Sequence, residues 1–571
     1  MNGITLLLIS VALLVLGYIF YGRYLCKKWG VGELDTETPA HTMEDGIDYV
    51  PAKAPVLMGH HFSSIAGAGP ITGPISAAAA GFGWGACALW IIIGGIFFGG
   101  VHDFGALFAS VRHGGKSIGE IISANMSKRA KRLFIIFAYL TLILVVAAFA
   151  SIVAGTFGAT FDASGAVDMV ASEANARVAM VSILFIVIAI IFGFCVYRRN
   201  VPMGAASVVG VLAIVAIIAI GLNFHPIYLS TNAWMWIVGV YICVASIAPV
   251  WILLQPRDYL SSFLLYAMLA LAAVAVFKGN PDMSSMPVLN TPNNPTPVFP
   301  VLFTTIACGA ISGFHSLVSS GTTSKQLDKE TDAKPIAYGG MLLECVLAIM
   351  TLVATAYAYS LKGTEFELTG ATAIFGGGIA GMIDPSRGSV YTTLYTLLVL
   401  TYSAFCLTSL DTATRLARFM FQEFWLDGSK GETPENVTGY KKLLTNPYVA
   451  TLITVFLGVM LGLNGYGKIW ALFGSANQLL AALGLLAVAT WLGNIGKDNK
   501  MFLLPMAFML LVTIFSLIIN TKTQLGLISA GGADWGPYVQ AILGVIMIVL
   551  AVVLAIEGVM TIAKQKKAAK A

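Results

Sequence analysis

Long apolar runs separated by short polar segments extend along the whole chain. A helix of about 20 apolar residues can cross the hydrocarbon core of a membrane, which is about 30 Å thick. Most of the runs reach that length, so the pattern predicts an all-α polytopic membrane protein with about fifteen transmembrane helices. The predicted spans are residues 3–22, 60–80, 86–112, 132–155, 176–196, 202–222, 232–254, 258–277, 299–322, 335–360, 388–412, 446–465, 468–492, 501–520 and 537–563.

Composition supports a membrane protein and excludes several other classes. Of the 571 residues, 57% are hydrophobic and 11% are charged, whereas a soluble domain carries about 25% charged residues. The chain has neither the H-E-x-x-H pattern of a metalloprotease nor the phosphate-binding G-x-x-x-x-G-K-[ST] pattern of an ATP-driven pump. Its net charge of +5 follows from basic loops, and we expect no nucleic-acid partner and no enzymatic activity. The seven cysteines form no C-x-x-C pair and are predicted to be core residues.

The distribution of Lys and Arg among the loops predicts the orientation. The loop after the span 86–112 carries Arg112, Lys116, Lys128 and Arg129, and loops rich in Lys and Arg lie in the cytoplasm. Alternation of the spans then places the other basic loops on the same side, together with the basic C-terminal tail. The pattern predicts a multi-pass protein of the plasma membrane, with its N-terminus outside and its C-terminus inside.

The span 60–80 contains a segment that is unusually polar for a transmembrane helix. Between His60 and Pro74 the chain has two histidines, three hydroxyl side chains, three glycines and two prolines. Backbone that is unwound at this depth has to line a cavity inside the protein, and secondary transporters bind substrates at such broken helices. A first half-helix is predicted to end near Ala66–Gly69 and a second to start at Gly73–Pro74. The competing interpretation is a kinked helix that packs tightly through small residues.

A second interruption is predicted at Ser246–Pro249, in the span 232–254. This span is the fifth after 60–80 and runs in the opposite direction, as a 5+5 inverted repeat requires. The N-termini of the two half-helices would bind a carboxylate near the middle of the membrane, through free N–H groups and their positive dipole ends. The predicted substrate-binding residues are His60, His61, Ser63, Ser64, Gly67, Gly69, Thr72, Gly73, Ala248 and His315.

The repeat divides the chain into five regions. They are an N-terminal helix and cytoplasmic linker at 1–59, the two five-helix repeats at 60–222 and 232–412, an interfacial segment at 413–445, and peripheral C-terminal helices at 446–571. The interfacial segment begins with residues that are basic on one side and aromatic on the other, as in a helix lying on the membrane surface. The division rests on the order of the spans, because the two halves show no convincing similarity residue by residue.

Ionisable residues inside predicted spans are candidates for proton transfer, because burying them is costly. Asp103 lies near the middle of its span, Glu344 is similarly deep, and His315 carries an imidazole that exchanges protons near neutral pH. These three residues are predicted to carry or sense a coupled proton, and the alternative is that they form structural hydrogen bonds. Asp411 is four residues before Arg415, so these two are predicted to form an ion pair at the membrane boundary.

The span 299–322 also offers ligands for a sodium ion. A backbone carbonyl followed by two hydroxyls one turn later supplies hard oxygen ligands on one helix face, and carbonyls at the first break would complete the set. The alternative is that these hydroxyls bond to carbonyls of their own helix. The predicted sodium ligands are Ala66, Gly69, Ser316, Ser319 and Ser320.

Six segments of the chain resemble the carbon starvation protein A (CstA) family of bacterial inner-membrane transporters. They are Gly59–Pro70, Asp103–Phe104, Gln255–Leu260, Gly313–Thr323, Leu410–Arg415 and Phe473–Ala482. The resemblance extends over about residues 50–490 and departs from the family pattern at His102, where we expect Gln. It implies proton-driven uptake of pyruvate or small peptides during carbon starvation. It also implies the LeuT-like 5+5 fold of the amino acid–polyamine–organocation group.

The sequence thus predicts a secondary active symporter that imports a small carboxylate-bearing nutrient, pyruvate or short peptides, together with protons and without a cofactor. A sodium-coupled peptide or amino-acid transporter is the alternative within this class. Alternatives of another class are a channel and a non-transporting membrane sensor. A channel needs a continuous polar pore, whereas the polar residues of the predicted spans gather at one depth.

Overall fold

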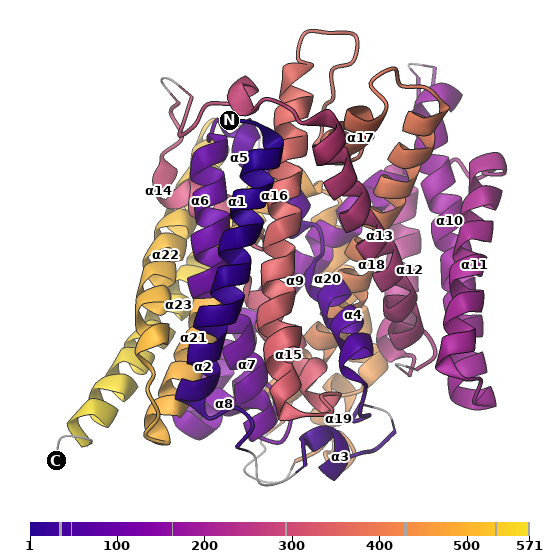
Figure 1. Ribbon diagram of the computed structural model, residues 1–571. Helices are drawn as coiled ribbons and strands as arrows, with labels where there is room; N and C mark the ends of the chain where they lie inside the picture. Colours follow the sequence, from indigo (N-terminus) through magenta and orange to yellow (C-terminus); the bar gives the residue numbers. More distant parts are fainter. Residues whose placement is uncertain are drawn as a thin grey trace.

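The computed structural model describes most of the chain as a bundle of helices. The described residues are 1–33, 37–46, 48–162, 164–249, 251–291, 294–426, 432–531 and 534–568. Within these ranges the regular elements are helices and no strand is present. Figure 1 shows the helices standing side by side, with the N-terminus at one end of the bundle and the C-terminus at the other. The fold is therefore of the predicted all-α class.

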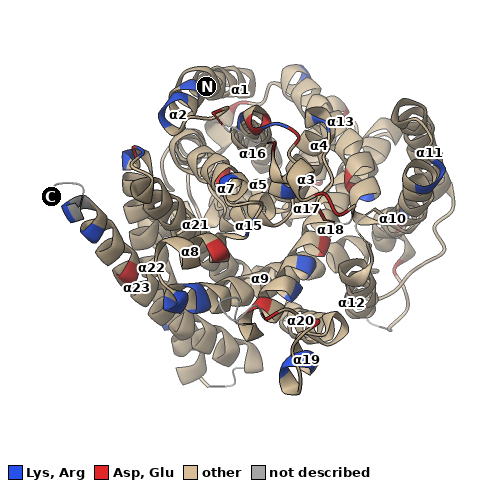
Figure 2. Cartoon of the chain, turned by 90° about the horizontal axis from the view of Figure 1, so that it is seen from below, with Lys and Arg blue, Asp and Glu red and all other residues tan. Residues whose placement is uncertain are grey.

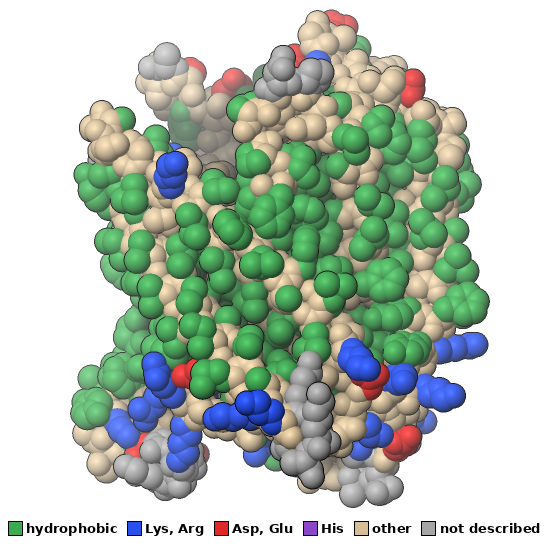
Figure 3. Space-filling view, turned by 90° about the vertical axis from the view of Figure 1, so that its left-hand side faces the viewer, with side chains coloured by type: hydrophobic (Ala, Val, Ile, Leu, Met, Phe, Trp, Pro, Cys, Tyr) green, Lys and Arg blue, Asp and Glu red, His purple; other side chains and the backbone are tan. Residues whose placement is uncertain are grey.

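A broad hydrophobic belt surrounds the bundle. In Figure 3 apolar side chains cover the middle of the visible face, and most of the Lys and Arg side chains gather at its lower end. This end, termed the basic face below, holds the short helices α3 (Pro39–Thr42), α8 (Ile118–Asn125) and α19 (Tyr440–Leu444) in Figure 1. An apolar belt bounded by charged side chains is the surface that a lipid bilayer requires.

Eleven helices of the described chain are long and apolar enough to cross a membrane. They coincide with eleven of the fifteen predicted spans. These helices are α1–α2 (Gly3–Trp29), α6–α7 (Trp84–Arg112), α9 (Lys128–Phe157), α10 (Met169–Gly193, continuing to Arg198), α11 (Met203–Asn223), α13 (Leu254–Gly279), α16 (Gly339–Ser360), α18 (Ser389–Trp425), α21 (Tyr466–Asn494), α22 (Lys500–Ser529) and α23 (Trp535–Ala568).

The other four predicted spans correspond to shorter helices. Two of these spans are single helices and two are broken into a pair. They are α4 (Ala54–Ile65) with α5 (Gly69–Ala79), α12 (Thr231–Ile247), α14 (Val298–Thr305) with α15 (Gly313–Gly321), and α20 (Pro447–Gly462). A further helix, α17 (Ala371–Ile383), lies between α16 and α18.

The break between α4 and α5 confirms the first predicted interruption. The first half ends at Ile65, one residue before the predicted Ala66–Gly69, and the second half begins at Gly69 and not at Gly73–Pro74. Pro70 stands in the first turn of α5, where proline is well accommodated. Pro74 lies inside α5, where it removes only the hydrogen bond to the carbonyl four residues earlier.

A second break, between α14 and α15, lies in a span that was predicted to be continuous. The residues that join these helices touch the first break. A Cβ added to Gly69 would lie 2.2 Å from Cβ of Cys308, and one added to Gly73 would lie 3.2 Å from the carbonyl oxygen of Thr305. Glycine at both positions lets the two broken helices approach closely.

The predicted interruption at Ser246–Pro249 is not a break within a spanning helix. Helix α12 ends at Ile247 with Ala248 as its cap, and the next helix, α13, begins at Leu254 and is itself long enough to span. Proline shortly after a helix end cannot continue the helix. No half-helix begins near Pro249, so the second broken helix of the described chain is α14–α15. The two repeats at 60–222 and 232–412 remain predictions.

Two predicted boundaries in the C-terminal half are also wrong. Residues after 412 do not form a separate surface helix, because α18 continues without interruption to Trp425 and its Arg415 and Arg418 are 6% and 7% exposed. Helix α21 is not peripheral, since 94% of its most apolar stretch is buried. Viewed from the basic face in Figure 2, α7, α15 and α16 lie near the middle of the bundle, and α11 and α23 lie at its edge.

Candidate functional site

Two acidic and two histidine side chains meet in the interior of the bundle. His102 and Asp103 lie on α7, His315 lies on α15, and Glu344 lies on α16. Nδ1 of His102 is 2.7 Å from Oδ1 of Asp103, and Nδ1 of His315 is 2.8 Å from Oδ2 of the same carboxylate. Nε2 of His315 is 3.5 Å from Oε2 of Glu344, which is an ion-pair distance. These four residues are termed the core network.

The core network is sealed from solvent. Asp103, His315 and Glu344 are 0% exposed and His102 is 1% exposed. Neither carboxylate oxygen of Glu344 has a hydrogen-bond partner among the described residues. The structure thus brings the three predicted proton carriers together across three helices. Their role in carrying protons remains a prediction.

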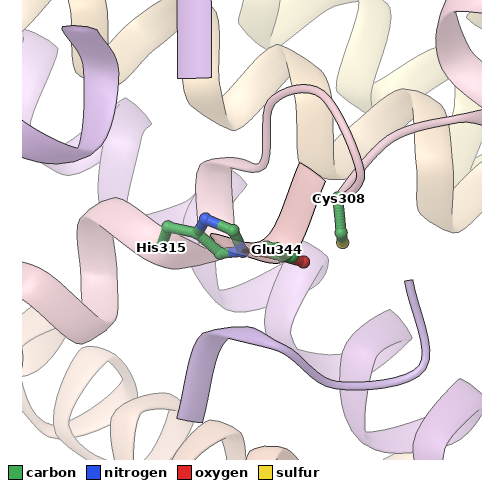
Figure 4. A group of neighbouring side chains, drawn as sticks. All are labelled: Cys308, His315 and Glu344. Carbon is green, nitrogen blue, oxygen red and sulfur yellow. Dashed lines mark ion pairs between the residues drawn. The ribbon is translucent and has the colours of Figure 1, made fainter. Parts of the chain in front are cut away.

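The core network borders the second break through Cys308. Figure 4 shows the imidazole of His315 directed toward the carboxylate of Glu344, with the thiol of Cys308 nearby, and donor atoms of the three lie within 4.8 Å of one another. Such a spacing suits a metal ion, but two of the three donors already belong to the core network. The thiol accepts a hydrogen bond from the amide of Asn477 at 3.5 Å and packs against Gly69. We therefore interpret Cys308 as a packed core residue that links the break to the network.

A second group of charged side chains is buried nearer the basic face. Arg257 donates from Nη2 to Oδ1 of the adjacent Asp258 at 2.9 Å, and from Nη1 to Oδ2 of Asp411. The hydroxyl of Tyr241 donates to the same Asp411 oxygen at 2.7 Å. Nδ1 of His60 is 3.0 Å from Oδ2 of Asp258. These five residues, from α4, α12, α13 and α18, are termed the arginine network.

The arginine network corrects the predicted ion pair between Asp411 and Arg415. Asp411 pairs with Arg257, and Arg415 instead donates to the backbone carbonyls of Ala245 and Ala248. Ala248 therefore lies at the end of α12 and holds an arginine, and the structure does not place it at the helix breaks with the other predicted substrate-binding residues. The signal that could have revealed the network is Arg257–Asp258, an ionic pair at the start of a long apolar run. Both residues are buried, at 1% and 0% exposed.

Most predicted substrate-binding side chains of α4 and α5 have partners on neighbouring helices. Nδ1 of His61 is 2.8 Å from the hydroxyl of Thr323, and the hydroxyl of Thr72 is 3.0 Å from that of Tyr402. The hydroxyl of Ser63 is bonded to the carbonyl of its own helix at His60.

Two buried polar atoms beside the first break have no partner in the part of the chain that the structure describes. They are Nε2 of His61 and the hydroxyl oxygen of Ser64. The carbonyl of Ser64 accepts a hydrogen bond from Ser409 on α18 at 3.0 Å, and Gly67 packs against the same serine. Helix α18 thus holds the first break in place.

The hydroxyls among the predicted sodium ligands differ in their hydrogen bonding. The hydroxyl of Ser316 donates to the carbonyl of Gly313, and that of Ser320 donates to the carbonyl of Ser316, both at 2.7 Å. These two hydroxyls therefore bond to carbonyls of their own helix, which was the alternative to sodium binding. The hydroxyl of Ser319 is buried and lacks a hydrogen-bond partner among the described residues. Sodium binding remains a prediction.

The two half-helices that start at the breaks present different N-termini. One N–H group in the first turn of α15 is capped, because Phe314 donates to the side-chain oxygen of Asn477 at 2.9 Å. The amide nitrogen of Asn477 in turn donates to the hydroxyl of Ser312 at 3.0 Å. Helix α5 begins at Gly69 in contact with Cys308. The N-terminus of α5 therefore faces the core network and is the half-helix end suited to an anion.

Broken helices that touch inside an apolar bundle, with ionisable groups buried beside them, define a multi-pass membrane transporter. The chain belongs to the carbon starvation protein CstA family, whose model matches residues 2–366 and 356–516. The resemblance predicted from the six segments is thereby confirmed. The relatives are transporters and not enzymes.

Three relatives show the range of the family. The chain is 32% identical to the "Peptide transporter CstA" of Bacillus subtilis, over 89% of each chain. It is 33% identical to the protein of the same name from Campylobacter jejuni, over 90% of this chain and 80% of that one. It is 30% identical to the "Pyruvate/proton symporter BtsT" of Escherichia coli, over 92% of this chain and 83% of that one.

Solved structures match the chain at low sequence identity. MhsT in complex with L-phenylalanine is 12% identical, with a TM-score of 0.49 over 89% of this chain and 99% of that chain. A mutant of the Eremococcus coleocola manganese transporter is 12% identical, with a TM-score of 0.49 over 92% of this chain and 99% of that chain.

Proposed function

We propose that this protein is a proton-coupled secondary symporter that imports pyruvate or short peptides across the bacterial inner membrane during carbon starvation. The names of the relatives support both substrates, and one relative is named as a proton symporter. We propose further that the basic face is cytoplasmic, because loops rich in Lys and Arg remain on that side. The N-terminus is then outside and the C-terminus inside.

The observation that carries the proposal is the core network. It contains two carboxylates and two imidazoles that are buried together, and it includes no Lys or Arg. Two unneutralised carboxylates at this depth would be very costly. The network therefore has to take up protons to neutralise its charge. A site of this kind changes its proton content when another charge arrives or leaves.

The N-terminus of α5 supplies the place for that second charge. It begins at Gly69, which touches Cys308, and Cys308 lies beside His315 and Glu344. A substrate carboxylate bound there would meet the N–H group of Gly69 and the positive end of the helix dipole, since Pro70 has no N–H and Ile71 and Thr72 donate to the carbonyl of Ala68. The unpartnered polar atoms of His61 and Ser64 would contact the rest of the substrate.

Coupling follows from the closeness of these two charges. A bound carboxylate adds a negative charge beside the core network, so binding favours the protonated form of the His315–Glu344 pair. Substrate and proton therefore bind together and are released together. The half-helices α4 and α5, and α14 and α15, can tilt independently at their breaks. This tilting would open the site to one side of the membrane at a time.

The test is uptake of labelled pyruvate into proteoliposomes that contain the purified protein. An inward pH gradient is imposed first, then a sodium gradient, with the dipeptide alanyl-alanine as a competitor. Accumulation driven by the pH gradient supports the proposal, and competition by the dipeptide decides between pyruvate and peptide. Absence of accumulation of either compound under the pH gradient would contradict the proposal.

Sodium coupling is a second candidate that one observation favours. The hydroxyl of Ser319, one turn from His315, is buried and has no hydrogen-bond partner among the residues that the structure describes. If a sodium gradient drives accumulation and Ser319→Ala abolishes this sodium-driven accumulation, sodium replaces the proton as the coupling ion. Accumulation that is indifferent to sodium contradicts this candidate.

A further inference from the structure

A cavity of about 320 Å³ lies at the basic face, where α4 and α13 begin. Its volume is at the lower end of the range for small-molecule sites, which is about 300–1,000 Å³. The polar part of its lining consists of Lys53, His60, Tyr197, Gln255, Tyr259 and Gln326. The cavity is separate from the core network, because none of the core network residues lines it.

His60 connects this cavity to the arginine network. Its side chain is 4% exposed. Nδ1 faces Asp258 at 3.0 Å, whereas Nε2 has no hydrogen-bond partner within the described chain. A buried polar atom without a partner is costly. His60 also lines the cavity, so a ligand held there lies beside this imidazole.

The net charge of the arginine network depends on whether His60 is protonated. The arginine network has one guanidinium, from Arg257, and two carboxylates, from Asp258 and Asp411. Without His60 the network carries one excess negative charge in the interior. A protonated His60 removes that excess and makes the network neutral. The loss of this proton leaves Asp258 with a neutral imidazole as its partner.

Five elements pack against α4, and each carries charged or titratable side chains. The neighbours are α13, α18, α15, α16 and the turn that precedes α16. The charged and imidazole groups on these elements are Arg257, Asp258 and Lys278 on α13, Asp411, Arg415, Arg418 and Glu423 on α18, His315 on α15, Glu344 on α16, and Lys334 in the turn. Arg415 is bonded to backbone carbonyls, and Lys334 lies over the ring of Tyr18. His61 of α4 itself is bonded to Thr323. Asp258 is therefore the charged partner bonded to His60.

We propose that this cavity is a release site, at which the substrate carboxylate and the coupled proton leave the protein together. The inference rests on the proposed function and names a second site for the same substrate class. The carboxylate accepts a hydrogen bond from protonated Nε2 of His60 and is attracted by the ammonium group of Lys53. The amides of Gln255 and Gln326, which are 3.4 Å apart, contact the remaining polar groups of the substrate.

Release then follows from deprotonation. Nε2 of His60 gives its proton to water in the cavity and retains the proton on Nδ1, which is bonded to Asp258. The neutral ring no longer attracts the carboxylate, so the anion departs. An alkaline interior favours this step, which gives the transport cycle its direction under an inward pH gradient.

The first test compares affinities on the two sides of the membrane in His60→Gln proteoliposomes. Half-saturating concentrations of pyruvate and of alanyl-alanine are measured from outside by uptake and from inside by efflux. We expect the interior value to rise about tenfold, which is the loss of one charge-assisted hydrogen bond, and to lose its dependence on interior pH. The exterior value is expected to change less than twofold. His225→Gln is the control, because this histidine lies outside both networks and is bonded to the carbonyl of Gly221.

A second test does not depend on a buried substitution. Lys53→Cys places a thiol at the exposed rim of the cavity, and its labelling by a maleimide trapped inside the vesicle is measured with and without interior substrate. We expect substrate to slow labelling at pH 6 and not at pH 8. Lys329→Cys is the control, because Lys329 is exposed and does not line the cavity.

The outcomes separate the two proposals. Normal uptake by the unsubstituted protein, with an unchanged interior half-saturation in His60→Gln or no protection of Lys53→Cys at either pH, would overturn the release site alone. Absence of uptake by the unsubstituted protein would overturn the proposed function and the release site with it.

Discussion

The core network and the arginine network are both buried clusters of acids and histidines, yet they are built on opposite principles. The core network includes no permanent cation, and its links are one carboxylate shared by two imidazoles and one longer contact to Glu344. The arginine network is centred on a guanidinium that bonds two carboxylates and a hydroxyl. Only bound protons can balance the negative charge of the core network. In the arginine network, the fixed positive charge of Arg257 balances much of the negative charge. The comparison assigns proton uptake to the core network. The arginine network positions helices, and within it the proposed release step involves the proton of His60 alone.

The largest effect is expected from removing the cation of the arginine network. Arg257→Met leaves the carboxylates of Asp258 and Asp411 buried without a cation, which costs about 3–5 kcal/mol of the free energy of unfolding. We expect most of the protein to be lost as aggregate, as measured by size-exclusion chromatography in detergent.

The matched control for this substitution is Arg129→Met. The Arg129 side chain is 74% exposed and 3.4 Å from Glu557, so its loss costs at most about 1 kcal/mol. Equal yields of the two variants would show that the arginine network does not position helices.

The second effect concerns coupling and not stability. Asp103→Asn keeps the size of the side chain but removes the charge that the two imidazoles share. A pH gradient of one unit corresponds to about 1.4 kcal/mol and about tenfold accumulation. We expect the variant to reach the membrane and to equilibrate labelled substrate without accumulating it. Accumulation that persists in Asp103→Asn would assign coupling to another group.

The third effect concerns Glu344, the second carboxylate of the core network. Glu344→Gln retains a partner for His315 but cannot become charged. We expect the initial uptake rate to fall about tenfold, on the scale of one buried hydrogen bond, and its dependence on exterior pH between 5.5 and 8 to flatten. A rate profile parallel to that of the unsubstituted protein would leave Glu344 with a structural role only.

The smallest effect is expected at the edge of the arginine network. Tyr241→Phe removes the hydroxyl that lies 2.7 Å from both Arg257 and Asp411. Because the ion pair remains, the cost is about 1 kcal/mol, seen as a shift of a few degrees in Tm, with uptake within twofold of normal. Tyr139→Phe, whose hydroxyl has one contact at 3.3 Å to Thr454, is the matched control. A loss of uptake without a loss of Tm would give Tyr241 a part in transport itself.

Local chemistry was sufficient to predict the first break but not the second. Gly69 and Pro70 mark the start of α5 within the sequence itself. The residues between α14 and α15 are mostly apolar and contain no proline, so nothing local distinguishes them from a continuous helix. Their unwound path is stabilised by Asn477, which lies far away in the sequence and caps α15.

The same distinction applies to the candidate site. Asp103, His315 and Glu344 could be selected individually, since an ionisable residue deep in an apolar run is conspicuous. That they touch depends on how α7, α15 and α16 pack, which no spacing along one helix reveals. For Asp411, the local spacing along the helix predicted the wrong partner. Its spacing to Arg415 satisfied a local rule, but Arg257 on α13 lies closer to it in the folded protein.

The length of α18 has a practical consequence. Its 37 residues extend about 55 Å at 1.5 Å per residue, which exceeds the roughly 30 Å of hydrocarbon. The helix is therefore longer than a perpendicular crossing requires, and it is bonded to the first break through Ser409 and to α13 through Asp411. An antibody fragment that binds near Trp425 would hold a helix that is bonded to the first break and to the arginine network. It would be a means of trapping one conformation for imaging.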